Sequence, residues 1–202
     1  ITQRSQKRSV TQVDSVIEEA FARMEKAAKN TGNISGIPSG FHALDKITSG
    51  WQTPDLIIIA ARPAMGKTAF VLSMIKRMAV DHGIPCAIFS LEMSNQQLVQ
   101  RLMVNVSELS GEKLRSGQLA PYEWGQLDKR VRQLYNAPIY IDDTPSLSVL
   151  ELQTKARRLV REFGVKIIMI DYLQLMKASG LNINSRQEEV SAVSRALKAL
   201  AK

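Results

Sequence analysis

The segment LIIIAARPAMGKT, which runs from Leu56 to Thr68, carries residue types that can bind a polyphosphate. Its five apolar residues, 56–60, predict a strand buried on both faces, because nothing polar interrupts them. A short loop follows, and Gly66, Lys67 and Thr68 then open an apolar run typical of a helix. In such a layout backbone N–H groups surround the phosphates, the lysine contacts the terminal phosphates, and the hydroxyl faces Mg²⁺. The predicted nucleotide-binding residues are Ala61, Arg62, Pro63, Ala64, Met65, Gly66, Lys67, Thr68 and Ala69.

One position departs from the pattern G-x-x-x-x-G-K-[ST], because its first glycine is Ala61 here. Alanine adopts a positive φ at a higher cost than glycine. Pro63 already stiffens the loop, so we expect a turn that does not need the left-handed region at Ala61. A chance Gly-Lys-Thr on a structural turn is the alternative, and the flanking strand and helix patterns favour the nucleotide site over it.

Acidic residues end three further apolar runs that read as strands: Glu92 after 86–91, Asp142 and Asp143 after 138–141, and Asp171 after 165–170. In a parallel α/β sheet, ligands bind at the carboxyl ends of the strands. Asp171 is the candidate for holding Mg²⁺, with a turn-capping role as its alternative. Glu92 is the candidate base for an attacking water, although an acid at a helix N-terminus is equally compatible with the pattern. The two aspartates at 142 and 143 are weaker candidates for that base.

Strands alternating with helices predict one α/β domain with a mainly parallel sheet, covering residues 34–202. Residues 1–33 form a basic tail, an amphipathic helix at Val13–Lys29 and a linker. The apolar stripe of that helix needs a partner. It can fold onto its own domain or dock on a neighbouring subunit, and the reach of the linker favours the neighbour.

Composition narrows the class of protein. Of the 202 residues 45% are hydrophobic, which is enough for a sizeable core. The formal net charge of +8 is compatible with a nucleic-acid partner or with an ordinary basic surface. The single cysteine, Cys86, excludes an internal disulfide framework and reads as a buried core residue. No apolar run approaches a membrane span and no secretory signal is visible, so we expect a cytoplasmic protein.

Four segments in order resemble the C-terminal motor domain of the DnaB family of bacterial replicative DNA helicases. They are residues 36–45, the phosphate-binding loop, FSLEMS at 89–94 and IDYLQLM at 170–176. The resemblance covers essentially the whole chain, and the helix at Val13–Lys29 is similar to the family's linker helix. It implies a RecA-like P-loop NTPase fold in which Lys67 and Thr68 take phosphate and Mg²⁺. Glu92 is then the catalytic base, assisted by Lys67, and Asp171 is the second Mg²⁺ residue.

The same resemblance implies a nucleoid-associated homohexameric ring that hydrolyses ATP and moves on single-stranded DNA at a replication fork. The linker helix would dock on the neighbouring subunit, and primase and a loader would be partners. A further strand, an arginine finger and a DNA-contacting loop are expected beyond Lys202, so the isolated chain should be an incomplete, weakly active motor. Lys177 and Arg186, around a polar loop, are the predicted DNA contacts, with a merely solvated loop as the alternative.

Two other functions share these motifs. A recombination ATPase of the RecA or RadA type has the same core and forms filaments on DNA. An ATP-switched assembly or loading module would bind nucleotide without productive turnover.

Overall fold

The computed structural model describes residues 12–29, 34–177 and 185–202. Three of the four predicted strands form, and helices alternate with them along the chain. In chain order the elements are α1 (Val13–Lys29), α2 (His42–Thr48), α3 (Lys67–Lys76), the π-helix η1 (Arg77–Asp81), β1 (Cys86–Ser90), α4 (Asn95–Ser107), α5 (Gly111–Ser116), α6 (Pro121–Tyr135), β2 (Ile139–Asp142), α7 (Val149–Phe163), β3 (Ile167–Asp171), the 3-10 helix η2 (Leu173–Leu175) and α8 (Arg186–Ala201).

The sheet is parallel, with β1 at its centre in the order β2-β1-β3. Phe89 pairs with Asp142 of β2, and Ser90 pairs with Asp171 of β3. The carboxyl ends of all three strands therefore lie at one edge. This arrangement confirms the predicted α/β class and brings the strand-end acids to the edge where ligands of such sheets bind.

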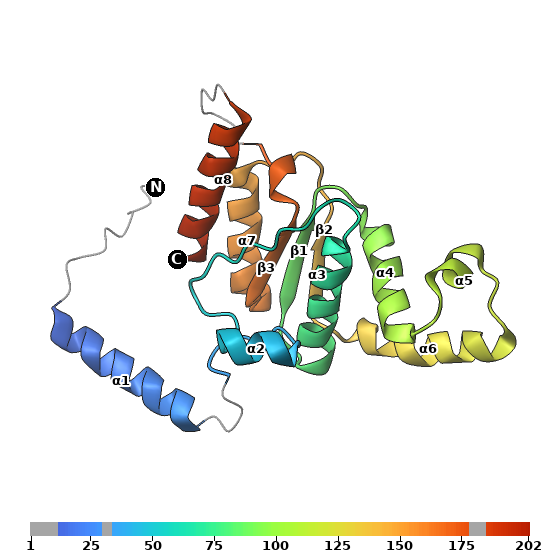
Figure 1. The fold of residues 1–202 in the computed structure, drawn as a ribbon, viewed down its shortest axis with the longest axis horizontal. Helices are drawn as coiled ribbons and strands as arrows, with labels where there is room; N and C mark the ends of the chain where they lie inside the picture. Colours follow the sequence, from blue (N-terminus) through green and yellow to red (C-terminus); the bar gives the residue numbers. More distant parts are fainter. Residues whose placement is uncertain (1–11, 30–33, 178–184) are drawn as a thin grey trace.

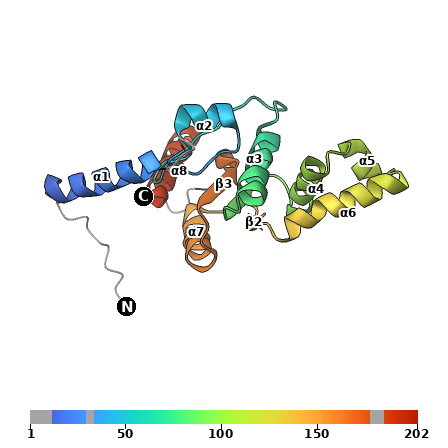
Figure 2. The same ribbon diagram turned by 90° about the horizontal axis from the view of Figure 1, so that it is seen from below.

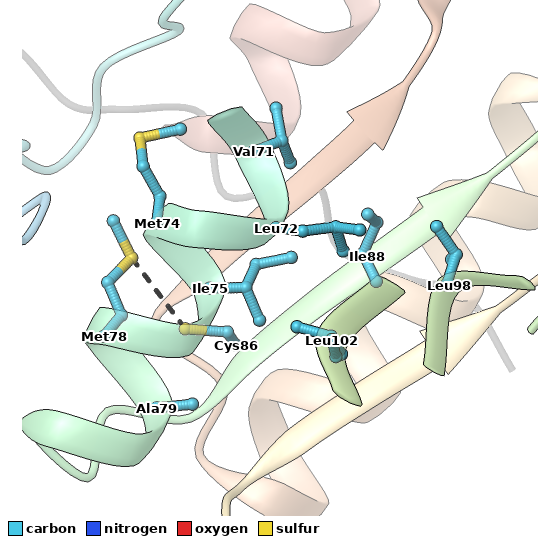
Figure 3. Close-up of a cluster of buried hydrophobic side chains, with 10 residues drawn as sticks. All are labelled: Val71, Leu72, Met74, Ile75, Met78, Ala79, Cys86, Ile88, Leu98 and Leu102. Carbon is cyan, nitrogen blue, oxygen red and sulfur yellow. Dashed lines mark hydrogen bonds between the residues drawn. The ribbon is translucent and has the colours of Figure 1, made fainter. Parts of the chain in front are cut away.

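Two apolar clusters cover the two faces of the sheet, because alternate residues of β1 point to opposite sides. Cys86 and Ile88 face a cluster formed with α3, η1 and α4, which Figure 3 shows in close-up. Phe89 faces a second cluster formed with α7, α8 and Met176. In Figure 1, α3 and α4 lie on one side of the strands and α7 and α8 on the other. The result is a sheet between two helical layers.

The predicted strand at Leu56–Ala60 is wrong. The segment belongs to no strand, and Ile58 is 72% exposed rather than buried. An apolar run predicts burial but cannot provide a pairing partner, and among the described residues the sheet ends at β3. Leu56 packs against the α7–α8 cluster and Ile59 against the α3–α4 cluster. The segment thus reaches both layers by side-chain packing without joining the hydrogen-bonded ladder.

The segment 36–45 holds α3 in place. The buried Asp45 carboxylate accepts hydrogen bonds from backbone N–H groups six and five residues earlier, at 2.7 and 3.2 Å, which shapes the turn. The Phe41 ring stacks on Phe70 of α3 with centroids 4.8 Å apart. The Arg77 guanidinium donates to the Gly40 carbonyl at 2.8 Å and lies over the Phe41 ring. These contacts fix the helix that begins at the phosphate-binding loop.

Two parts project from this body on opposite sides, as Figures 1 and 2 both show: α1 on one side and the α5–α6 hairpin on the other. The α1 stripe is exposed, with Val13 63%, Phe21 63% and Met24 66% accessible. None of the helices in the described ranges is long and apolar enough to cross a membrane.

The buried thiol gives a first prediction. Burial raises the pKa of Cys86 to about 12, and its Sγ donates to the Ile84 carbonyl at 3.2 Å. Because the thiolate is the reactive form, we expect no alkylation of Cys86 by iodoacetamide in the folded protein at pH 8.5, and no acceleration at pH 10. Denaturant should make it react at the rate of an ordinary thiol. Mass spectrometry of the Cys86 peptide measures this, and rapid labelling of the folded protein would contradict the burial.

Candidate nucleotide-binding site

The phosphate-binding loop takes its left-handed turns at Ala64 (φ 63°) and Gly66 (φ 85°). Ala61, which stands where the motif has its first glycine, has no positive φ. The expectation that the loop does not need the left-handed region there is confirmed. Gly66 is the N-cap of α3 and its carbonyl accepts from the Phe70 N–H at 2.9 Å. The helix therefore begins directly at the loop and presents its free N–H groups and its positive dipole end to whatever the loop binds.

Lys67, Thr68 and Asp171 come together although 103 positions separate the last two along the chain. The Thr68 hydroxyl donates to Asp171 Oδ2 at 2.6 Å, and the Lys67 ammonium lies 2.8 Å from Asp171 Oδ1. The Asp171 side chain is 4% exposed, while that of Lys67 is 26% exposed. The ion pair with Lys67 is the contact of the buried Oδ1 in the described part of the chain, and no hydrogen bond is assigned to this oxygen. A carboxylate oxygen of this kind is a suitable ligand for a hard cation or its bound water.

Tyr172, which the sequence analysis did not single out, provides a second contact for the lysine. The Lys67 ammonium lies 4.1 Å from the centre of the Tyr172 ring, within the range of a cation–π interaction. The aromatic ring follows Asp171 directly in sequence, so one short segment supplies both groups. A tyrosine after a strand-end aspartate carries no specific signal in a single sequence, and only the fold reveals its proximity to Lys67.

Glu92 lies in the turn between β1 and α4, at the same edge of the sheet as Asp171. The Leu91 N–H donates to the Asp171 carbonyl at 2.8 Å, which ties the backbone beside Glu92 to the end of β3. The Glu92 side chain is exposed, and it has no hydrogen-bond or ion-pair partner in the ranges that the structure describes. Its carboxylate is therefore available to a ligand or water at this edge.

The two weaker candidates at the end of β2 are occupied by structural contacts. Asp142 pairs with the Lys155 ammonium at 2.6 Å and accepts from the Thr144 N–H at 3.0 Å. Burial works to raise the pKa of Asp142, but the hydrogen bonds from Lys155 and Thr144 outweigh it and hold the pKa below its usual value. Asp143 Oδ2 accepts from the Asn95 N–H at 2.8 Å, at the start of α4. Both carboxylates thus stabilise local structure.

The two predicted DNA contacts, Lys177 and Arg186, lie on either side of residues 178–184, which are outside the described residues. Lys177 is exposed and its backbone pairs with that of Ser148. Arg186 opens α8 and its guanidinium forms an ion pair with Glu189 one turn later. Their role as DNA contacts stays a prediction.

Comparison with known proteins places these features in a family context. The family model described as DnaB-like helicase C terminal domain matches residues 36–202. The replicative DNA helicase DnaB of Geobacillus stearothermophilus is 45% identical over 202 residues, which are 100% of this chain and 44% of that protein. The replicative DNA helicase DnaC of Bacillus subtilis (strain 168) is 42% identical with the same coverage. The chain therefore spans less than half the length of these two relatives.

Solved structures agree with the sequence comparison. The ATPase domain of G40P superposes with a TM-score of 0.87 and 34% identity, covering 96% of this chain and 68% of that one. A DnaB-like replicative helicase, studied with its interactions with primase, gives a TM-score of 0.82 and 34% identity, covering 96% and 46%.

The left-handed turn at Gly66 gives a second prediction. A Cβ added to Gly66 would meet no atom within 4 Å, so Gly66→Ala tests backbone strain alone. We expect it to lower the free energy of unfolding by about 1–2 kcal/mol, the cost of φ > 0 for an L-residue. Urea unfolding followed by circular dichroism measures this.

Gly125 provides the matched control, because it lies in open space within α6 and has no positive φ. Gly125→Ala should raise the free energy of unfolding by roughly 0.5–1 kcal/mol, since alanine suits a helix interior better than glycine. A shift of both variants in the same direction would contradict the assigned loop conformation.

Proposed function

The chain belongs to the family of DnaB-like helicase C-terminal domains, and on this premise we propose that it is the ATP-hydrolysing motor of a replicative DNA helicase. The observation that carries the proposal is the meeting of Lys67, Thr68 and Asp171 at the N-terminus of α3. A cation, a hydroxyl and a buried carboxylate at a helix N-terminus are the groups that bind a triphosphate with its metal ion.

Binding of ATP would replace the contacts that these side chains make with one another by contacts with the nucleotide. The Lys67 ammonium would leave Asp171 for the terminal phosphates, and the N–H groups at the start of α3 would surround them. The residues fit Mg²⁺, because the Thr68 hydroxyl and Asp171 Oδ1, which has no assigned hydrogen bond, are hard oxygen ligands. When bound, Mg²⁺ neutralises charge on the phosphates. The Lys67–Asp171 ion pair keeps both charges compensated until the nucleotide arrives.

Glu92 would act as the general base. Its exposed carboxylate lies at the edge of the sheet that carries Asp171, and it accepts the proton of a water that attacks the γ-phosphate. A carboxylate that is already held by a lysine, such as Asp142, is a poorer proton acceptor because its pKa is lowered. This contrast favours Glu92 over the other acids that follow the strands.

The family resemblance also motivates a proposal for the assembly and its partners. We propose that the ATPase domain covers residues 34–202 and that α1 docks its exposed stripe on the neighbouring subunit of a hexameric ring. Single-stranded DNA in the ring is the proposed polyanionic partner, with Lys177 and Arg186 as contacts, and it suits the net charge of +8. Primase is a proposed partner because a structural relative of 34% identity is described in its interactions with primase, and a loader is proposed from the family resemblance.

The experiment that tests the proposal compares two variants of the full-length protein with single-stranded DNA present. Glu92→Gln should lower the rate of phosphate release from ATP at least about 100-fold, the contribution of a general base, with the affinity for a fluorescent ATP analogue unchanged. Lys67→Ala should weaken the binding of that analogue itself, because the phosphates lose their cation.

Glu112→Gln is the matched control, since it removes the same charge from an exposed position on α5. Phosphate release by Glu92→Gln at the rate of this control would show that Glu92 is not the base. Parental affinity in Lys67→Ala would show that the loop does not hold the phosphates.

A further inference from the structure

The turn that carries Glu92 is closed by one buried hydroxyl. Ser90, the last residue of β1, is 2% exposed. Its Oγ donates to the Met93 carbonyl at 2.7 Å and accepts from the Met93 N–H at 3.1 Å. The side chain thus reaches across the turn and satisfies both backbone groups of Met93, on the far side of Glu92.

Neighbouring contacts fix the rest of this turn. The Leu91 N–H is bonded to the Asp171 carbonyl at 2.8 Å, so the residue before Glu92 is tied to β3. Ser94 and Gln97 form a capping box at the start of α4, and Asp143 accepts from the Asn95 N–H. Every backbone neighbour of Glu92 is therefore held, while its own side chain is exposed.

We propose that Ser90 is a positioning residue for hydrolysis, which sets the distance of the Glu92 carboxylate from the reacting phosphate. The inference rests on the proposed role of Glu92 as the base. A general base must lie within hydrogen-bond reach of the water that it activates. A displacement of about 1 Å can lower a rate by roughly 100-fold. The two bonds of Ser90 to Met93 are the contacts that hold the turn closed across Glu92.

The test measures ATP hydrolysis by Ser90→Ala in the full-length protein with single-stranded DNA. We expect kcat to fall at least about tenfold, with KM for ATP and the affinity for a non-hydrolysable ATP analogue within about twofold of the parent. A loss in binding with an unchanged kcat would overturn the proposal.

Ser107→Ala is the matched control. Ser107, at the other end of α4, is also fully buried, and its Oγ donates to the Val104 carbonyl and accepts from the Leu109 N–H, both at 3.4 Å. The change of residue and the kind of contact are the same, but the site lies at the far end of the helix from Glu92. Ser107→Ala should lower the melting temperature without changing kcat. An equal kcat for Ser90→Ala and Ser107→Ala would show that Ser90 has only a structural role.

A double-mutant cycle separates positioning from general damage. If Ser90 acts through Glu92, then Ser90→Ala should not lower the residual turnover of Glu92→Gln any further, because residues that act as a unit are not additive. Additive losses would overturn the proposal. If Glu92→Gln alone keeps the parental turnover, Glu92 is not the base, and the proposal for Ser90 fails with it. If Glu92→Gln loses turnover while Ser90→Ala keeps the parental turnover, only the proposed role of Ser90 fails.

Ser90→Cys repeats the test where Ser90→Ala fails to fold. Cysteine is close to serine in shape, but its S–H is a weak donor and its sulfur a weak acceptor. We expect a folded protein with the same fall in kcat and unchanged KM. Parental kcat in a folded Ser90→Cys would overturn the proposal.

Discussion

The contact of Asp171 with Lys67 and Thr68 is the constraint on which the site depends. A carboxylate that is 4% exposed carries a large desolvation cost unless it is paired. Here the end of β3 brings the charge, and the start of α3 brings the ammonium and the hydroxyl that compensate it. Because Thr68 and Asp171 are 103 positions apart, this pairing exists only when the sheet and the α3 layer are correctly packed. The same groups that stabilise the fold at this edge are those that a nucleotide and its metal ion would use.

The packing behind this edge explains how the groups are held. β1 is buried along its whole length, between the α3–α4 cluster on one face and the α7–α8 cluster on the other. Its register pairs Ser90 with Asp171. The turn that carries Glu92 therefore begins level with the end of β3. Phe41 and Arg77 hold α3 against the segment that precedes the loop. The positions of the charged groups are thus set by apolar packing and strand pairing.

Sequence alone predicted the parts that depend on local pattern. Gly66, Lys67 and Thr68 at the start of a helix, and acids at the ends of strands, follow from spacing and burial patterns. The structure brings Lys67, Thr68 and Asp171 together, and their roles toward a nucleotide stay a prediction. The strand at Leu56–Ala60 was wrong because an apolar run does not specify its hydrogen-bond partner. The ring of Tyr172 under Lys67 and the hydroxyl of Ser90 across the turn were missed because they depend on tertiary contacts. A common residue in a single sequence gives no sign of such contacts.

The acids at this edge differ in their surroundings, and this difference separates the roles that we propose for them. Asp171 is buried, and its two oxygens contact Lys67 and Thr68, which suits a group that would hold a cation. Asp142 is ionised and held by Lys155, so its lone pairs are in use and its lowered pKa makes it a weak proton acceptor. Glu92 has a fixed backbone but an exposed side chain with no partner in the described ranges. A base must keep a lone pair free for the proton that it accepts while its own position is restricted. Of these carboxylates, the structure gives that combination to Glu92.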